Sequence, residues 1–147
     1  MKINIMSLGS ALVHIPKSPT YAIRIKLSEY LRDPEMNFGN LVESPLFHSV
    51  NEYVFDDIYS QRSDSSNVLF TPEIASGMLI DFLNERNGCD TLLVHCERGK
   101  NRSPAVAMAF NDIFHLGHDR DKLKSEYQGY NWHVYHVLMR EARRSGI

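Results

Sequence analysis

The sequence predicts an α/β fold in a single domain, with a central mixed, mostly parallel sheet flanked by helices. Short apolar runs that suit β-strands alternate along the chain with longer segments whose apolar residues recur at helical spacing, which is typical of this class. With 147 residues, 43% of them hydrophobic, the chain is long enough for one substantial core and too short for a second.

Five short runs rich in apolar or β-branched residues are predicted to be strands. They are residues 3–8 (INIMSL), 11–15 (ALVHI), 21–25 (YAIRI), 52–55 (EYVF) and 91–95 (TLLVH). The run at 91–95 is apolar at consecutive positions, as in strands covered on both faces, so we expect it near the centre of the sheet. Residues 31–49 have no clear period and are expected to form loop and short helix.

Three helices are marked by residues that favour helix starts. Thr71 is placed as an N-cap before Pro72, and Ser103 with Pro104 repeats this pattern. Asn131 is expected to open the last helix. The apolar stripes expected to face inward are Ala75, Leu79, Phe82 and Leu83, then Val106, Phe110, Ile113 and Phe114, and finally Val134, Val137 and Leu138.

The charge balance argues against a nucleic-acid or membrane partner. A formal charge of −2 with intermixed signs creates no field that would gather polyanions, so any attraction for phosphate must be local. No apolar run approaches the length of a membrane span, and the amino-terminal stretch is interpreted as a strand. Cys89 and Cys96 would lie roughly 20 Å apart along a strand, too far for a disulfide. We therefore expect a reducing, cytoplasmic location.

No metal site is expected. Two histidine pairs have helical spacing, His115 with His118 and His133 with His136, but no carboxylate or cysteine cluster accompanies them. Four aromatic residues near the last helix are expected to pack in the core: Tyr127, Tyr130, Trp132 and Tyr135.

Chemically active residues follow the strand 91–95 at once. A tight loop, 96–102, leads to a helix expected to begin at Ser103. Successive backbone N–H groups in such a loop face one concavity, and the positive end of the following helix adds to their attraction for an anion. The pattern therefore predicts an anion cradle at this point.

Three residues of the loop suit the binding and reaction of a phosphoryl group. Gly99 lets the backbone turn where a side chain would obstruct it. Arg102 supplies a planar fork that matches two phosphate oxygens. The positive surroundings stabilise the thiolate of Cys96, which makes it a good nucleophile. Such a loop would perform phosphoryl transfer through a phosphocysteine.

Five residues match a known signature: His95, Cys96, Gly99, Arg102 and Ser103. They resemble the H-C-x-x-G-x-x-R-S motif of the cysteine-dependent protein tyrosine phosphatases, in the compact branch that includes the dual-specificity enzymes. The order of elements is similar over roughly the second two thirds of the chain. The resemblance implies a phosphatase-type strand–loop–helix phosphate cradle and hydrolysis of phosphotyrosine, or of phosphoserine and phosphothreonine as well, in a phosphorylated protein.

The resemblance also implies a role for each residue. Cys96 would attack phosphorus, and Arg102 would hold the equatorial oxygens through the transition state. Ser103 would donate a hydrogen bond to the sulfur as it leaves, and His95 would brace the loop from behind. The phosphate-binding loop would comprise Glu97, Arg98, Gly99, Lys100, Asn101 and Arg102. No cofactor is implied.

The family also uses an aspartic acid on a mobile loop as general acid, and three candidates remain. Asp57 is preferred because it follows the strand 52–55 directly, as the acid does in relatives whose strand ends in a similar F-x-D pattern. Asp56 is one alternative, although it would equally suit an inward-facing or turn-capping position. Asp64 is the other, at the spacing nearest to that usual before Cys96, but among serines typical of a solvated loop.

The rim of the loop bears on the substrate. Arg98 and Lys100 add positive charge, which Glu97 partly offsets. Lys100 is similar to a lysine of the phosphoinositide-directed phosphatases, and Asn101 to an asparagine of the RNA 5′-triphosphatase branch. A rim that attracts any phosphorylated ligand is the favoured interpretation. Alternative functions are the same chemistry on a phosphoinositide or an RNA 5′-phosphate, and a non-catalytic phosphate-binding module, against which the intact Cys96 argues.

Overall fold

The computed structural model describes residues 1–147 and contains a four-stranded sheet in the order β1-β4-β2-β3. The strands are β1 (Lys2–Ser7), β2 (Thr20–Lys26), β3 (Phe47–Val54) and β4 (Thr91–Cys96). The α/β class is confirmed, and β4 lies between β1 and β2, in the interior of the sheet, as predicted. All three strand pairings are parallel. The prediction that the sheet is mixed, with some antiparallel pairing, was therefore wrong.

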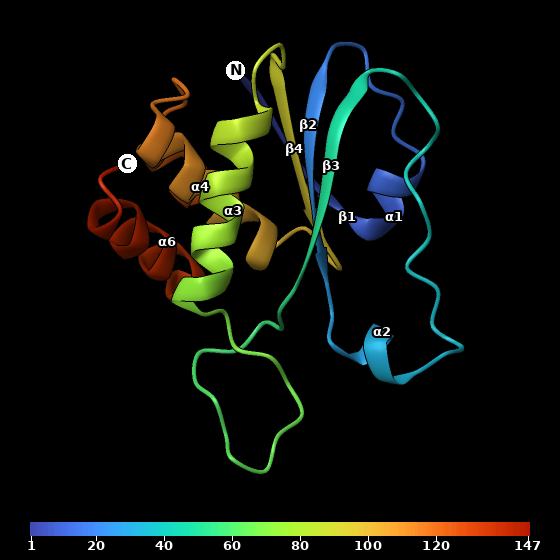
Figure 1. Ribbon diagram of the computed structural model, residues 1–147, viewed down its shortest axis with the longest axis vertical. Helices are drawn as coiled ribbons and strands as arrows, with labels where there is room; N and C mark the ends of the chain where they lie inside the picture. Colours follow the sequence, from blue (N-terminus) through green and yellow to red (C-terminus); the bar gives the residue numbers. More distant parts are fainter.

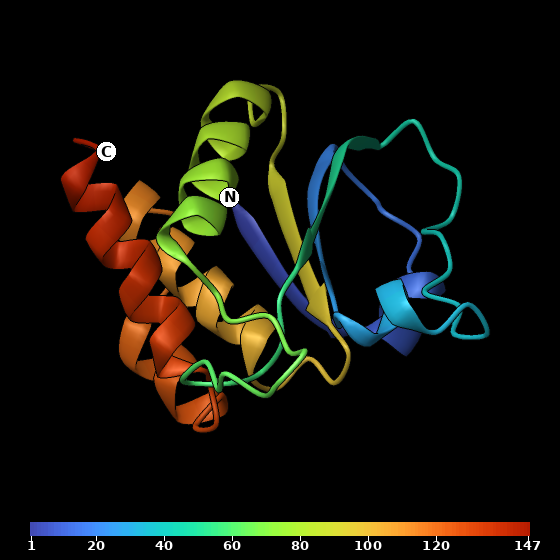
Figure 2. The same ribbon diagram turned by 60° about the horizontal axis from the view of Figure 1, so that its bottom comes forward.

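Six helices cover the two faces of this sheet (Figures 1 and 2). One face carries α3 (Pro72–Glu85), α4 (Arg102–Phe114), α5 (Arg120–Glu126) and α6 (Trp132–Arg144). The other face carries the short helices α1 (Leu8–Leu12) and α2 (Glu29–Arg32), with the irregular segment that follows α2. The sheet is therefore the middle layer, as parallel sheets require.

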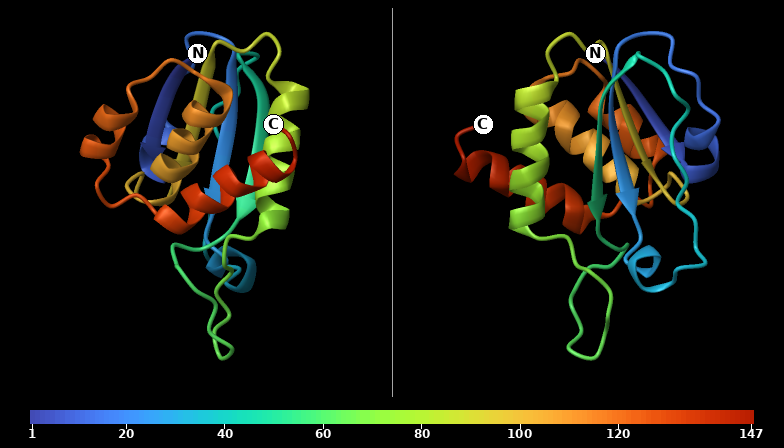
Figure 3. Two further views of the ribbon diagram at one scale, coloured as in Figure 1. Left: turned by 90° about the vertical axis from the view of Figure 1, so that its left-hand side faces the viewer. Right: turned by 45° about the vertical axis from the view of Figure 1, so that its right-hand side comes forward.

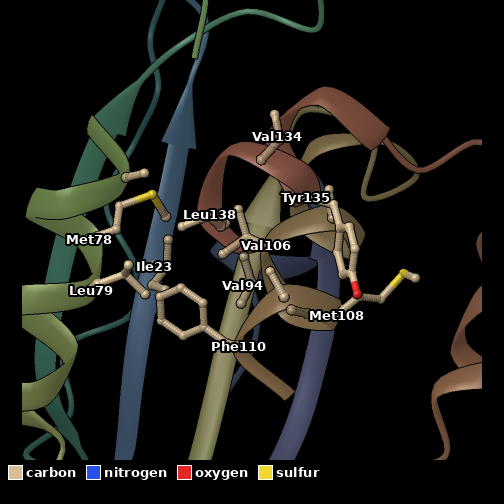
Figure 4. Close-up of a cluster of buried hydrophobic side chains, with 14 of the residues drawn as sticks. Ile23, Met78, Leu79, Val94, Val106, Met108, Phe110, Val134, Tyr135 and Leu138 are labelled. Carbon is tan, nitrogen blue, oxygen red and sulfur yellow. The ribbon is translucent and has the colours of Figure 1, made fainter. Parts of the chain in front are cut away.

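The main core lies between the sheet and the longer helices (Figure 4). Ile23 of β2 and Val94 of β4 point toward Met78 of α3, Phe110 of α4 and Leu138 of α6, and all five side chains are buried. Cys96, two positions after Val94, belongs to the same cluster because alternate residues of a strand share a face. The thiol is thus carried on the helix-covered side of the sheet.

His95 faces the opposite side. In the parallel register its partner on β2 is Arg24, and both side chains are buried on the face that α1 and α2 cover. Phe38, from the irregular segment after α2, packs against the His95 ring with centroids 5.5 Å apart. Although His95 and Cys96 are neighbours in β4, they therefore lie on opposite faces of the sheet.

The predicted strand at 11–15 was wrong. Ser7 ends β1, and its side-chain oxygen accepts a hydrogen bond from the Ser10 backbone N–H at 3.2 Å, which starts the helix α1. Val13 and Ile15, two of the apolar residues that suggested a strand, are 75% and 72% exposed. A local cap therefore overrode the apolar pattern.

The predicted starts of α3 and α6 are confirmed. The Thr71 and Asn131 side chains accept hydrogen bonds from the backbone three residues on, at 3.3 and 3.1 Å. In α3 the predicted Leu83 is 43% exposed, and Met78 is buried in its place. The aromatic prediction was wrong for Trp132, which is 52% exposed.

The segment 31–49 is irregular beyond α2, but its last residues begin β3, whose start at Phe47 is earlier than predicted. Exposed and half-buried residues alternate along β3, because it is an edge strand. No helix in the structure has both the length and the apolar character needed to cross a bilayer. The structure holds no group of three or more histidine, cysteine or carboxylate side chains arranged to bind a metal ion.

Candidate active site at the end of strand β4

The predicted cradle lies where the parallel strands end. β4 stops at Cys96, α4 begins at Arg102, and residues 97–101 turn between them. The arrowheads in the right-hand view of Figure 3 point to this edge of the sheet, where the segment after β3 also emerges. Open parallel sheets place their ligand sites outside the carboxyl ends of the strands.

Hydrogen-bond donors converge on the sulfur of Cys96. The backbone N–H groups of Gly99 and Ser103 donate to Sγ at 3.3 and 3.4 Å, and the Ser103 hydroxyl lies 3.1 Å from it. The sequence suggested Ser103 as an N-cap, but that position belongs to Asn101, and Ser103 lies inside α4. Its hydroxyl is directed to the sulfur instead, where these donors can stabilise negative charge.

Gly99 is required by the packing of the loop against β1. Its φ of +73° lies in the left-handed region. A Cβ atom there would lie 2.7 Å from the carbonyl carbon of Met6 and from the backbone nitrogen of Ser7. The end of β1 is thus the surface on which the cradle rests, and only glycine fits.

The Arg102 guanidinium has a hydrogen-bond partner at Nη1, but none along the edge formed by Nε and Nη2. Its side chain is buried, and Nη1 donates to the Phe55 carbonyl oxygen at 2.8 Å. This is the only hydrogen bond of the guanidinium, and Nε is buried with no partner. Buried polar atoms are rarely left unpaired, and an edge formed by Nε and Nη2 suits two oxygens of a bound anion.

A buried arginine that the sequence reasoning missed supports His95 from behind. Arg24 Nε donates to His95 Nε2 at 2.9 Å, and its guanidinium carbon lies 4.2 Å from the centre of the Phe38 ring. The nitrogen that accepts this bond carries no proton, so His95 is neutral with its proton on Nδ1. Burial and the charge of Arg24 together lower the pKa of His95 to about 4.

The other partners of the Arg24 side chain are hydrogen-bond acceptors from the segment after α2 and from β3. Nη1 donates to the Gly39 carbonyl oxygen at 2.9 Å and contacts a Glu52 carboxylate oxygen at 3.3 Å. The sequence signal was an arginine between two isoleucines in a predicted strand. Such a residue must either reach solvent or find buried acceptors.

Glu97 is tied to the opposite side of the sheet. The Tyr30 hydroxyl of α2 donates to its carboxylate, 2.9 Å from Oε1 and 3.2 Å from Oε2. Burial and this hydrogen bond raise the pKa of Tyr30 to about 12. Arg98 and Lys100, by contrast, are exposed. The rim of the loop therefore presents its two positive charges to solvent.

The Asp56 carboxylate forms hydrogen bonds that close the base of the loop between β3 and α3. Its carboxylate accepts hydrogen bonds from the Ser28 backbone, the Ser28 hydroxyl and the Val68 backbone at 3.0, 2.6 and 2.7 Å. Burial alone would raise the pKa of Asp56, but these bonds and the charge of Arg102 lower it below the ordinary value. A carboxylate so fully bonded is poorly suited to exchange protons with a ligand.

Asp57 is exposed and lies beside the cradle. Its Oδ1 accepts a hydrogen bond from Asn131 Nδ2 at 2.9 Å, and the backbone N–H of Asn131 donates to the Asn101 carbonyl oxygen at 2.9 Å. Asp64 is exposed and lies in the segment between β3 and α3, which forms the loop that projects at the bottom of Figure 1. The structure thus joins Asp57, and not Asp64, to the phosphate-binding loop through Asn131.

A groove of about 750 Å³ borders the cradle on its outer side. Arg98, Lys100 and Asn101 line it together with residues 126–129, at the end of α5 and in the segment that follows it. Neither Cys96 nor Arg102 reaches it. The groove is therefore a neighbour of the cradle and not its mouth.

Comparisons with protein-family models, with curated proteins and with solved structures found no match for this chain. Any function proposed for it therefore rests on the residues and geometry of the cradle.

Proposed function

We propose that the chain is a phosphomonoester hydrolase that works through a phosphocysteine, as do the cysteine-dependent protein tyrosine and dual-specificity phosphatases that its signature resembles. The observation that carries this proposal is the convergence of three potential donors on Cys96 Sγ at the start of α4. The unpaired edge of Arg102 supports it, because a phosphoryl group would supply the missing acceptors.

In the first step the Cys96 thiolate attacks phosphorus and the bond to the leaving oxygen breaks. The backbone N–H groups of the loop and the free edge of Arg102 hold the three phosphoryl oxygens, on which charge is spread in the transition state. Asp57 donates its proton to the leaving oxygen, so the alcohol departs neutral. The product of this step is a phosphocysteine and an aspartate carboxylate.

In the second step water replaces the sulfur on phosphorus. Asp57, now ionised, takes a proton from the attacking water. The Ser103 hydroxyl, 3.1 Å from Sγ, donates to the sulfur as it leaves with the electron pair. Inorganic phosphate is released, and Cys96 returns to the thiolate form.

We infer a phosphorylated protein as substrate, with phosphotyrosine as the first candidate. The exposed Arg98 and Lys100 attract any phosphorylated ligand, so a phosphoinositide and an RNA 5′-phosphate are compared by competition against a phosphotyrosine peptide. The chemistry needs a reduced Cys96, and both cysteines are free, which fits a reducing compartment such as the cytoplasm.

The test is hydrolysis of p-nitrophenyl phosphate by the purified chain. We expect activity that persists in EDTA and disappears in Cys96→Ser, because a hydroxyl is a far weaker nucleophile than a thiolate. Cys89→Ser is the matched control, since this cysteine lies outside the loop, and it should keep full activity. Activity retained by Cys96→Ser, or lost with EDTA, would overturn the proposal.

A further inference from the structure

Asn131 is a fully buried polar residue at which three segments meet. Its backbone N–H donates to Asn101 of the phosphate-binding loop at 2.9 Å. Its side-chain oxygen accepts from the Val134 backbone at 3.1 Å and so caps α6. Its side-chain nitrogen donates to Asp57 Oδ1 at 2.9 Å and to the Ile58 carbonyl oxygen at 3.2 Å. One residue therefore joins the cradle, the start of α6 and the candidate general acid.

The chemistry of the three contacts selects an asparagine. A cap needs only an oxygen acceptor, which serine or aspartate would supply equally well. The contacts with Asp57 and Ile58 need a donor on the same short side chain. If the amide were turned over, its oxygen would face the Asp57 carboxylate and its NH₂ group would face the Val134 N–H. Only the observed orientation satisfies every group.

The contact with Asn131 occupies only one of the two carboxylate oxygens of Asp57. Asn131 engages Oδ1, and no hydrogen bond in the structure uses Oδ2. Two residues before Asp57, the carbonyl oxygen of Phe55 accepts a hydrogen bond from Arg102 Nη1 at 2.8 Å. The segment carrying Asp57 is thus fastened to the cradle on two sides, by Arg102 before the aspartate and by Asn131 at it.

We propose that Asn131 is a positioning residue for the general acid: its amide NH₂ group fixes the Asp57 carboxylate beside the cradle with Oδ2 toward the leaving oxygen. This inference rests on the proposed phosphatase function. It adds to that function a requirement that the nine-residue signature does not contain, at a position 35 residues after Cys96. The capping role of Asn131 and its positioning role are separable by substitution.

Asn131→Ser and Asn131→Asp keep an N-cap oxygen but lack the amide NH₂ group that donates to Asp57 and Ile58. Aspartate has no N–H or O–H donor when ionised, and the single, shorter hydroxyl of serine is used at the cap. The measurement is kcat/KM, which reports phosphocysteine formation, for a poor leaving group (phenyl phosphate) and a good one (6,8-difluoro-4-methylumbelliferyl phosphate). General acid catalysis contributes about 10²–10⁴-fold where the leaving group needs a proton. We expect both variants to lose about tenfold or more on phenyl phosphate and less than about twofold on the good leaving group.

Two controls separate positioning from damage to the fold. Thr71→Ala removes the N-cap of α3, which has no contact with Asp57, and should lower the melting temperature with no change in leaving-group dependence. Asp57→Asn should lose activity on phenyl phosphate selectively, and Asp57→Asn combined with Asn131→Ser should be no worse than Asp57→Asn alone. Such non-additivity indicates that both residues serve one interaction.

The outcomes are distinguishable. Inactivity of the parent chain on both aryl phosphates overturns the proposed function. Selective loss in Asp57→Asn with none in Asn131→Ser or Asn131→Asp overturns the positioning role alone. Equal losses on both substrates would show that Asn131 only supports the fold, which would also contradict the positioning role.

A second measurement does not depend on activity. Amide hydrogen exchange in residues 57–59 should accelerate in Asn131→Ser but not in Thr71→Ala. Unchanged exchange in Asn131→Ser would show that the contact does not restrain this segment.

Discussion

His95 and Arg102 flank Cys96 in sequence, and each is held by a group that the signature does not contain. Arg24 of β2 fixes the ring of His95, while the carbonyl oxygen of Phe55, the first residue after β3, holds Arg102. The signature could be found from the sequence because its five residues lie within nine positions and are chemically constrained. These partners could not, because 71 and 47 residues separate them from the side chains they hold.

Arg102→Lys should abolish most of the proposed activity while leaving the fold intact. Lysine keeps the positive charge but cannot hold two oxygens and the Phe55 carbonyl at once. Loss of a donor aimed at transition-state charge costs about 10²–10³-fold in kcat. Steady-state kinetics on p-nitrophenyl phosphate would measure this, with Arg98→Lys on the exposed rim as the control. Near-parental turnover in Arg102→Lys would show that the guanidinium fork is not needed.

The neutral, buried His95 should make stability depend on pH below about 6.5. The pKa of His95 is lowered to about 4 in the folded chain, so between 6.5 and 4 the unfolded chain binds the extra proton. Stability from this residue is therefore complete above pH 6.5 and falls by about 3 kcal/mol as the pH drops toward 4. Urea unfolding at pH 7.5 and 4.5 measures the fall.

His95→Gln is the control for that measurement, because its amide oxygen can still accept from Arg24 but does not titrate. Its pH dependence should be flatter than the parent's, the carboxylates being common to both. Parallel curves for the two proteins would refute a buried neutral His95.

At the scale of elements, β4, the loop and α4 form a unit that local sequence determined well. A buried strand, a glycine at a turn and a helix start are each local signals, and they agree here. The error at 11–15 arose where two local signals conflicted, and the Ser7 cap outweighed the apolar run. Ser103 was misassigned for a different reason: α4 begins at Arg102 with Asn101 as its N-cap, and the Ser103 hydroxyl lies against the Cys96 sulfur instead.

Gly99→Ala should destabilise the loop and remove the proposed activity together. The added methyl group would lie 2.7 Å from the backbone of β1, which cannot give way as a flexible side chain could, and the φ of +73° disfavours alanine besides. We expect a cost of about 2–3 kcal/mol by urea unfolding. Gly9→Ala, where a Cβ atom meets nothing within 4 Å, is the matched control and should change stability far less.

At the scale of the whole molecule, the cradle draws on the ends of β1 and β3 and the start of α6 as well as on β4 and α4. The strand order β1-β4-β2-β3 brings these ends to one edge. Periodicity identifies strands but carries no information about their order or direction, which is why the sheet was expected to be mixed. Asn131 was recognised from sequence as a helix cap, but its contact with Asp57 depends on this assembly.

Trypsin should cut the native chain first at Arg62. This residue is exposed on the loop that projects from the sheet, among the small polar residues where proteases nick folded proteins. Asp56 and Val68 close the base of the loop through hydrogen bonds in both directions. Fragments 1–62 and 63–147 should therefore stay associated in gel filtration under native conditions. Early cleavage within α4 or α6, or separation of the fragments, would contradict this arrangement.

The guanidinium of Arg102 is in place before any phosphate arrives, because the Phe55 carbonyl holds it from behind. A site that is already rigid loses little conformational entropy when its ligand binds. Inorganic phosphate, which the proposed reaction leaves behind, offers this prearranged edge the same oxygens as the phosphoryl group of a substrate. Such an enzyme would work under standing product inhibition, and its turnover in the cell would follow the free phosphate level as well as the supply of substrate.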